Sequence, residues 1–132
     1  VNRDHSFNLN KKEKKLALKS ALSTKITEDK VVIIDTFELK SFKTKDLNND
    51  LKQFECRSAL FIHSEKGLDN NFKLASSNIP KVSILNQKGI NVKDIITFDK
   101  IFIEQESISE ITKRLSWNIN LKKLLLKELT RL

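Results

Sequence analysis

Cysteine, proline, glycine and methionine are scarce in this sequence of 132 residues, which contains one, one, two and none of them, respectively. The single cysteine, Cys56, permits no internal disulfide and fits a reducing compartment. No hydrophobic run approaches the roughly 20 residues that span a bilayer, and the first residues lead into no secretory signal. The lack of methionine indicates that Val1 is not the natural start, so we expect a processed chain or a piece of a longer one.

The two glycines, Gly67 and Gly89, stand alone. Neither the G-x-G-x-x-G pattern of dinucleotide sites nor the G-x-x-x-x-G-K-[ST] pattern of P-loops occurs, so no loop is predicted to cradle a diphosphate. His5 and His63 are far apart and lack cysteine or carboxylate partners at the spacing of zinc ligands. The sequence therefore predicts neither a cofactor nor a metal site, and Cys56 is interpreted as a half-buried, inert thiol.

Alanine is also rare, with four residues, whereas lysine, asparagine and isoleucine are common. This bias is what an AT-rich coding sequence produces. We therefore expect the source to be an AT-rich bacterium or a mitochondrial or plastid lineage.

The net charge of +8 is concentrated at the two ends of the chain. Residues 1–25 contain seven basic and two acidic residues, and residues 113–132 contain six basic residues and one acidic residue. Residues 26–112 contain twelve basic and fourteen acidic residues, so this region is nearly neutral. A generic solubilising charge does not explain this segregation, and basic ends are typical of a protein that binds a polyanion.

A lysine-rich helix is predicted near the N-terminus, with Asn10 as its N-cap. Leu18, Ala21, Leu22 and Ile26 follow at spacings of three and four, which places them on one face of the helix. Four lysines fill the first turn, although the partial positive charge of a helix N-terminus disfavours cations there. A docked polyanion makes the arrangement favourable, since backbone N–H groups, dipole and lysines all attract phosphate; the alternative is a solvated basic turn. The four lysines are Lys11, Lys12, Lys14 and Lys15.

Strands and helices alternate through the middle of the chain. Runs of β-branched and other apolar residues predict four buried strands, and apolar residues at helical spacing predict the helices between them. This alternation implies a parallel sheet with right-handed crossovers. We predict an α/β fold, a small three-layer domain with a four-stranded, mainly parallel sheet, which is Rossmann-like in topology but has no nucleotide-binding loop. The strands are expected at 30–35, 58–63, 81–85 and 100–103, and the helices at 10–26, 44–54 (capped by Thr44), 69–76, 106–115 (capped by Ser107 or a neighbour) and, as one turn containing Ile95 and Ile96, after Asn91.

The last part of the sequence has a different pattern. From Trp117 onwards, leucines at helical spacing alternate with basic residues, which predicts an amphipathic helix that packs on this domain or on a neighbouring chain. We therefore divide the chain into an extended basic lead-in (1–8), an α/β domain (9–115) and a helical extension (116–132). The leucine stripe consists of Leu121, Leu124, Leu125, Leu129 and Leu132.

Three carboxylates raise an enzymatic alternative. Asp35 follows the first strand, at the edge where α/β folds bind ligands, and Asp99 and Glu104 flank the fourth strand. A Mg²⁺-dependent nuclease needs two or three such acids to converge. Asp99 is expected at the opposite end of its strand from Asp35, so the set does not converge, and a binding role is favoured over an enzyme.

Five segments occur in the order and spacing of one known family. They are NKKEKKLALKSALS, KVVIIDTFEL, KTKDL, NNFKLASSNIPKV and GINVKDIITFDKIFI. From about Arg3 to Leu115 the chain resembles the C-terminal half of the universal large-subunit ribosomal protein L-four family. The resemblance implies an α/β sandwich and a structural, non-enzymatic role in binding and scaffolding large-subunit ribosomal RNA (rRNA). The family's N-terminal half, with an extended loop that reaches the peptide exit tunnel, has no counterpart in this sequence.

Carried over by position, the resemblance implies RNA contacts in two regions. The first comprises the segment before the first helix and the beginning of that helix, and the second is the KTK motif. The predicted RNA-binding residues are Arg3, His5, Lys11, Lys12, Lys14, Lys15 and Lys19 in the first region, and Lys43 and Lys45 in the second.

The resemblance also implies partners and a location. The expected partners are large-subunit rRNA and neighbouring large-subunit ribosomal proteins, without a membrane, and a separate chain that supplies the family's N-terminal half is a further candidate. The expected location is the large subunit of a mitochondrial, plastid or AT-rich bacterial ribosome, and not a secreted compartment. A third hypothesis is a protein-interaction module that works through the leucine-rich tail.

Overall fold

The computed structural model describes residues 2–116, so the predicted leucine-rich helix lies outside the described residues. The four predicted strands form one sheet in which all neighbouring strands are parallel. Its strand order is β1-β4-β2-β3, which places the last strand between the first two. The strands are β1 (Val31–Ile34), β2 (Ala59–His63), β3 (Val82–Asn86) and β4 (Lys100–Glu104).

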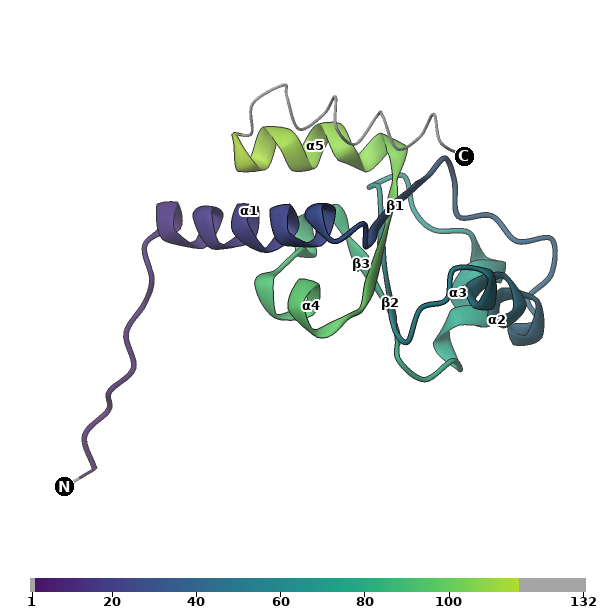
Figure 1. The fold of residues 1–132 in the computed structure, drawn as a ribbon, viewed down its shortest axis with the longest axis horizontal. Helices are drawn as coiled ribbons and strands as arrows, with labels where there is room; N and C mark the ends of the chain where they lie inside the picture. The colour runs from purple at the N-terminus through teal and green to yellow at the C-terminus, as the bar shows by residue number, and fades with distance from the viewer. Residues whose placement is uncertain (1, 117–132) are drawn as a thin grey trace.

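Helices cover both faces of this sheet and complete the predicted three layers. Figure 1 shows α1, α4 and α5 on one side of the sheet and α2 and α3 on the other. The connections from β1 to β2 and from β2 to β3 run in one direction across the sheet, whereas the connection from β3 to β4 runs back. Right-handed crossovers therefore place α4 on the face opposite to α2 and α3. The helices are α1 (Lys11–Thr27), α2 (Thr44–Gln53), α3 (Asn70–Ser77), the 3-10 helix η1 (Gln87–Gly89), α4 (Val92–Thr97) and α5 (Gln105–Leu115).

Each face of the sheet has its own hydrophobic core. Successive side chains of a strand point to opposite faces, so Leu60 and Ile62 of β2 pack with α1, α4 and α5, while Phe61 packs with α2 and α3. The second core is aromatic, and the ring centroid of Phe61 lies 4.9 Å from those of both Phe72 and Phe102. The two cores thus pack the helices against the two faces of the sheet.

The second half of α1 anchors this helix to the first core. Leu18 and Leu22 are buried there, and Ala21 and Ile26 pack against the same cluster, as the predicted stripe requires. Lys25 Nζ donates to the carbonyl oxygen of Phe98 at 2.7 Å. The first half of the helix has no such anchor among residues 2–116.

The prediction that Thr44 caps α2 is wrong. Thr44 is the first helical residue, and Lys43 occupies the N-cap position without a side-chain bond to the helix. Ser41 instead bridges the turn before the helix, because its hydroxyl accepts from Lys43 N at 3.2 Å and donates to Asp46 Oδ2 at 2.6 Å.

Two details of α4 and α5 also differ from the prediction. The turn containing Ile95 and Ile96 is present with Asn91 as its N-cap, but only Ile95 is buried, while Ile96 is 65% exposed. Helix α5 follows β4 directly and has Glu104 at its N-cap position. Ser107 is therefore inside the helix, where its buried hydroxyl donates to the carbonyl oxygen of Glu104 at 2.7 Å.

Candidate nucleic-acid interface

The first turn of α1 projects from the domain (Figure 1). Residues 11–17 are all exposed, and the helix reaches the core only at Leu18. Asn10 is the N-cap, as predicted, and its backbone N–H donates to Glu13 Oε2 at 3.1 Å. The four lysines of this turn are therefore displayed on a helix with a defined start, and Lys19, further along, is half-buried.

Four lysines elsewhere in the domain, Lys30, Lys66, Lys88 and Lys113, pair with carboxylates. Lys30 Nζ lies 2.9 Å from Glu28, and Lys66 Nζ lies 2.8 Å from Glu106. In both pairs the hydrogen bond and the attraction to the carboxylate raise the pKa of the lysine. Within residues 2–116, no ion pair involves a lysine of the first turn of α1. This turn is therefore a cluster of uncompensated positive charge, which an anionic ligand would neutralise.

A groove of about 520 Å³ lies beside this turn, between α1, α4 and the end of α5. Lys11, Lys14 and Lys15 line it from α1, and Arg114 lines it from α5. Arg114 Nη1 donates to the carbonyl oxygen of Lys88 at 2.9 Å, which fixes the guanidinium at the end of α5. Sequence reasoning did not single out Arg114, although the basic character of residues 113–132 was the available signal. The apolar residues of the lining are Leu9, Ala17, Leu18, Ile90, Val92 and Leu115.

The predicted contacts Arg3 and His5 lie in the extended segment that precedes α1. Both residues are exposed, and the segment leads away from the domain at the end of α1 that carries the lysines (Figure 1). The structure thus places these two residues and the lysine turn on one side of the molecule.

Lys43 and Lys45 are not brought together with the α1 lysines. Lys43 precedes α2 and Lys45 lies in its first turn, and both are exposed. Helix α2 covers the opposite face of the sheet from α1 (Figure 1). The two regions implied by the resemblance therefore form two separate surfaces.

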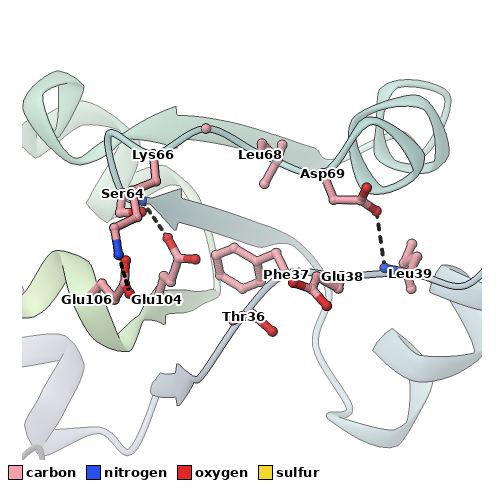
Figure 2. Close-up of a pocket in the computed structure, with 11 residues that line it drawn as sticks. Thr36, Phe37, Glu38, Leu39, Ser64, Lys66, Leu68, Asp69, Glu104 and Glu106 are labelled. Atoms are coloured by element: carbon pink, nitrogen blue, oxygen red, sulfur yellow. Dashed lines mark hydrogen bonds and ion pairs between the residues drawn. The ribbon is translucent and has the colours of Figure 1, made fainter.

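The carboxyl ends of β1, β2 and β4 border a second cavity, of about 540 Å³, which is rich in carboxylates (Figure 2). Most of these are already engaged by the protein. Glu104 Oε2 accepts from the backbone N–H of Ser64 at 2.6 Å, and Asp69 accepts from the backbone of the first turn of α3. Glu106 pairs with Lys66. These carboxylates hold the loops at the sheet edge, which is a structural role.

The acids of the nuclease hypothesis are not assembled into one site. Asp99 lies before β4, at the opposite sheet edge, where it accepts from the backbone N–H of Arg57 at 3.3 Å and lies 3.7 Å from Lys30 Nζ. Asp35 follows β1 and Glu104 is the last residue of β4, so both lie at the other end of the strands. Across residues 2–116, no group of three or more histidine, cysteine, aspartate or glutamate side chains is placed to hold a metal ion.

The remaining candidate residues have local structural contacts. Cys56 is half-buried with its Sγ 3.9 Å from the carbonyl oxygen of Leu51, and burial raises the pKa of its thiol, which favours the unreactive neutral form. His63 Nδ1 lies 2.7 Å from the carbonyl oxygen of Ser64.

In the described part of the chain, no helix has the length and hydrophobicity to cross a membrane.

Together these features define a small α/β domain whose clustered positive charge lies on an exposed helix turn, as in proteins that hold nucleic acid. A family model described as the ribosomal protein L4/L1 family matches residues 1–114. Since the match covers most of its length, the chain belongs to the ribosomal protein L4/L1 family. The resemblance based on five sequence segments is thus confirmed, and the family consists of ribosomal proteins rather than enzymes.

Curated relatives are similar over the same region. The chain is 41% identical over 115 residues to the large ribosomal subunit protein uL4 of Paramagnetospirillum magneticum, an alignment that covers 87% of the chain and 55% of that protein. It is 36% identical over 114 residues to uL4 of Magnetococcus marinus, with 86% and 55% covered. For uL4 of Lachnoclostridium phytofermentans the identity is 35% over 109 residues, with 83% and 52% covered. The chain spans about half the length of the curated relatives it matches.

Proposed function

We propose that the chain is a structural constituent of the large ribosomal subunit, and that it binds and scaffolds large-subunit rRNA through the first turn of α1 and the segment before it. The observation that carries this proposal is the lysine cluster on α1, which makes no ion pair within residues 2–116. The relatives support the setting, since each is named as a large-subunit protein.

The backbone of this turn adds to the attraction of its side chains. The first N–H groups of a helix have no carbonyl partner within it, and the helix dipole adds partial positive charge at the same place. In α1 the N–H of Lys14 donates to the carbonyl oxygen of Asn10 at 3.0 Å, and that of Asn10 donates to Glu13. Among the described residues, the N–H groups of Lys11 and Lys12 have no such partner. A phosphate oxygen can accept from them while the lysines neutralise its charge.

The other predicted contacts belong to the same proposal. Arg3 and His5 extend the surface along the lead-in (1–8), and Lys19 continues it along α1. Lys43 and Lys45 form a second contact on the far side of the sheet, so RNA must either wrap around the domain or approach it as two separate strands.

The partners and the location belong to the same proposal. We infer that neighbouring large-subunit proteins contact the α/β domain (9–115) and its extension (116–132). Composition supports a mitochondrial, plastid or AT-rich bacterial ribosome as the location.

The salt dependence of RNA binding tests the proposal. Each phosphate contact to a duplex adds about 0.9 to the slope of log affinity against log salt. Replacing Lys11, Lys12, Lys14 and Lys15 by glutamine is therefore expected to flatten this slope by about 3.6 for a bacterial large-subunit rRNA transcript if each lysine contacts one phosphate. Filter binding between 50 and 300 mM KCl, roughly the range over which such contacts weaken, measures the slope.

The matched control removes the same charge elsewhere. Lys52, Lys73, Lys81 and Lys93 are exposed and make no ion pair within residues 2–116, and their change to glutamine is expected to alter the slope by less than about 1. Equal slopes for the wild type and the α1 variant would exclude this turn as the RNA contact. Incubation of labelled RNA with Mg²⁺ tests the nuclease alternative, which requires cleavage that Asp35→Asn abolishes.

A further inference from the structure

The groove beside α1 has a preformed apolar floor. Ile90 and Leu115 form its base and belong to the first core cluster, where they are 3% and 0% exposed, and Leu18 connects this base to α1. The apolar surface that a ligand can reach comes from the exposed Leu9 and Ala17 and the half-buried Val92. The volume of the groove, about 520 Å³, lies within the range of roughly 300–1,000 Å³ that is usual for sites of small organic groups.

The rim of this groove is basic. Lys11, Lys14 and Lys15 line it from α1, and Arg114 lines it from α5. Arg114 uses only Nη1 to bond the carbonyl oxygens of residues 87 and 88 within the described part of the chain, so Nε and Nη2 remain for a ligand. A ligand that matches both features has a flat or apolar body and anionic groups on either side of it. An unpaired nucleotide with its flanking phosphates has this composition.

The uncharged polar side chain in the lining, Asn91, already has its hydrogen bonds within the protein. Asn91 caps α4, with Oδ1 accepting from Asp94 N at 2.9 Å and Nδ2 donating to Asp94 Oδ2 at 2.7 Å. It therefore offers little to the hydrogen-bonding edge of a base, and the groove would contact the face of any base equally well. An acidic amphipathic peptide also matches the charge, but the RNA ligand is continuous with the lysine turn that carries the proposed function.

We infer that the groove between α1, α4 and α5 accepts one unpaired nucleotide of RNA, with the base on the apolar floor and the adjacent phosphates on the α1 lysines and Arg114. This inference rests on the proposed function and extends it from attraction of phosphate to selection of unpaired RNA without selection of base.

Two RNA hairpins test the inference with the full chain: a fully paired stem, and the same stem with one bulged nucleotide carrying 2-aminopurine. Apolar surface removed from water contributes about 25 cal/mol per Å². A base that covers about 40 Å² of the lining is therefore expected to make the wild type bind the bulged hairpin about fivefold more tightly. The 2-aminopurine fluorescence should change as the base leaves the RNA stack for the groove. Bulged A, C, G and U should bind equally.

Two variants of α1 test whether the unpaired base binds in this groove. Ala17→Leu fills the groove from its lining, and it is expected to abolish the preference for the bulge while the salt slope stays unchanged. Ser20→Leu adds an apolar side chain one turn further along α1, at an exposed position outside the lining of the groove, and it should keep the preference. Circular dichroism of both variants confirms that the helix is intact.

The outcomes separate this inference from the proposed function. Equal affinity of the wild type for both hairpins, or a preference that survives in Ala17→Leu, overturns the nucleotide site even when the four-lysine variant flattens the salt slope. An unchanged slope in the four-lysine variant overturns the RNA contact itself. Binding of an acidic amphipathic peptide that Ala17→Leu abolishes, without any preference for the bulge, assigns the groove to a protein and also overturns the inference.

Discussion

Truncation of Phe61 to alanine is expected to remove a large part of the stability of the domain, because its ring is at the centre of the aromatic core. Phe61 is 2% exposed, and the ring centroids of Phe37, Phe72 and Phe102 lie 5.3, 4.9 and 4.9 Å from its own. Truncating a buried phenylalanine costs about 3–5 kcal/mol, and three aromatic neighbours favour the upper end, since each pair adds about 0.5–1.5 kcal/mol. A domain of this kind is stabilised by about 5–15 kcal/mol in total.

Urea denaturation followed by far-ultraviolet circular dichroism measures this loss. Phe61→Leu keeps an apolar side chain but no ring, so its free energy of unfolding should lie between those of the wild type and Phe61→Ala. Phe42 is 64% exposed, and Phe42→Ala should change the free energy of unfolding by less than about 0.5 kcal/mol. If Phe61→Ala costs no more than Phe42→Ala, the packing of the α2–α3 face is not as described.

Three further predictions concern a turn, a thiol and a cap. Gly67 has φ = +102°, so Gly67→Ala should lower the free energy of unfolding by about 1–2 kcal/mol in a urea titration. Gly89 has no positive φ and nothing within 4 Å of an added Cβ, so Gly89→Ala should leave that free energy unchanged. Burial raises the pKa of the Cys56 thiol in the folded protein, so the thiol of the unfolded chain ionises at lower pH. Stability should therefore fall as pH rises above about 8.5. The difference between the urea midpoints at about pH 7.5 and 10 should be smaller for Cys56→Ala than for the wild type. Glu13→Gln can keep the bond to Asn10 but removes the one acid of the first turn, so it should lower stability by about 0.5 kcal/mol while tightening RNA binding at low salt, as filter binding would show.

The fold could be predicted closely because its elements carry strong local signals. Each strand is a short apolar run, and each helix has apolar residues at helical spacing. The order β1-β4-β2-β3 could not be read in the same way, since four similar apolar runs do not identify their neighbours. The strand expected at 81–85 begins one residue later because Lys81 adopts φ = +64°, where a turn rather than the residue type determines the backbone.

The candidate site could be predicted only where it is local in sequence. The lysines at the start of α1 lie within five consecutive residues, so their unfavourable interaction with the helix dipole could be recognised without a structure. The groove could not be recognised in this way, because the start of α1 and the end of α5 form it together. Two of its lining residues, Ile90 and Arg114, are far from α1 in the sequence. For the same reason no local pattern indicated that Lys43 and Lys45, at the start of α2, lie on the opposite face of the sheet from α1.

The position of β4 between β1 and β2 has a consequence for the order of folding. Strand β1 bonds only to β4 in the described sheet, with Val31 opposite Ile101. Strands β2 and β3 are neighbours joined through a single helix, so they can pair early, whereas a contact between distant segments carries a larger loop-closure entropy. On a chain made from its N-terminus, β1 therefore waits until residue 104 has emerged. The helix that carries the lysines precedes β1 directly, so the element proposed to meet RNA is made before the strand that fixes its neighbour β1 in the sheet.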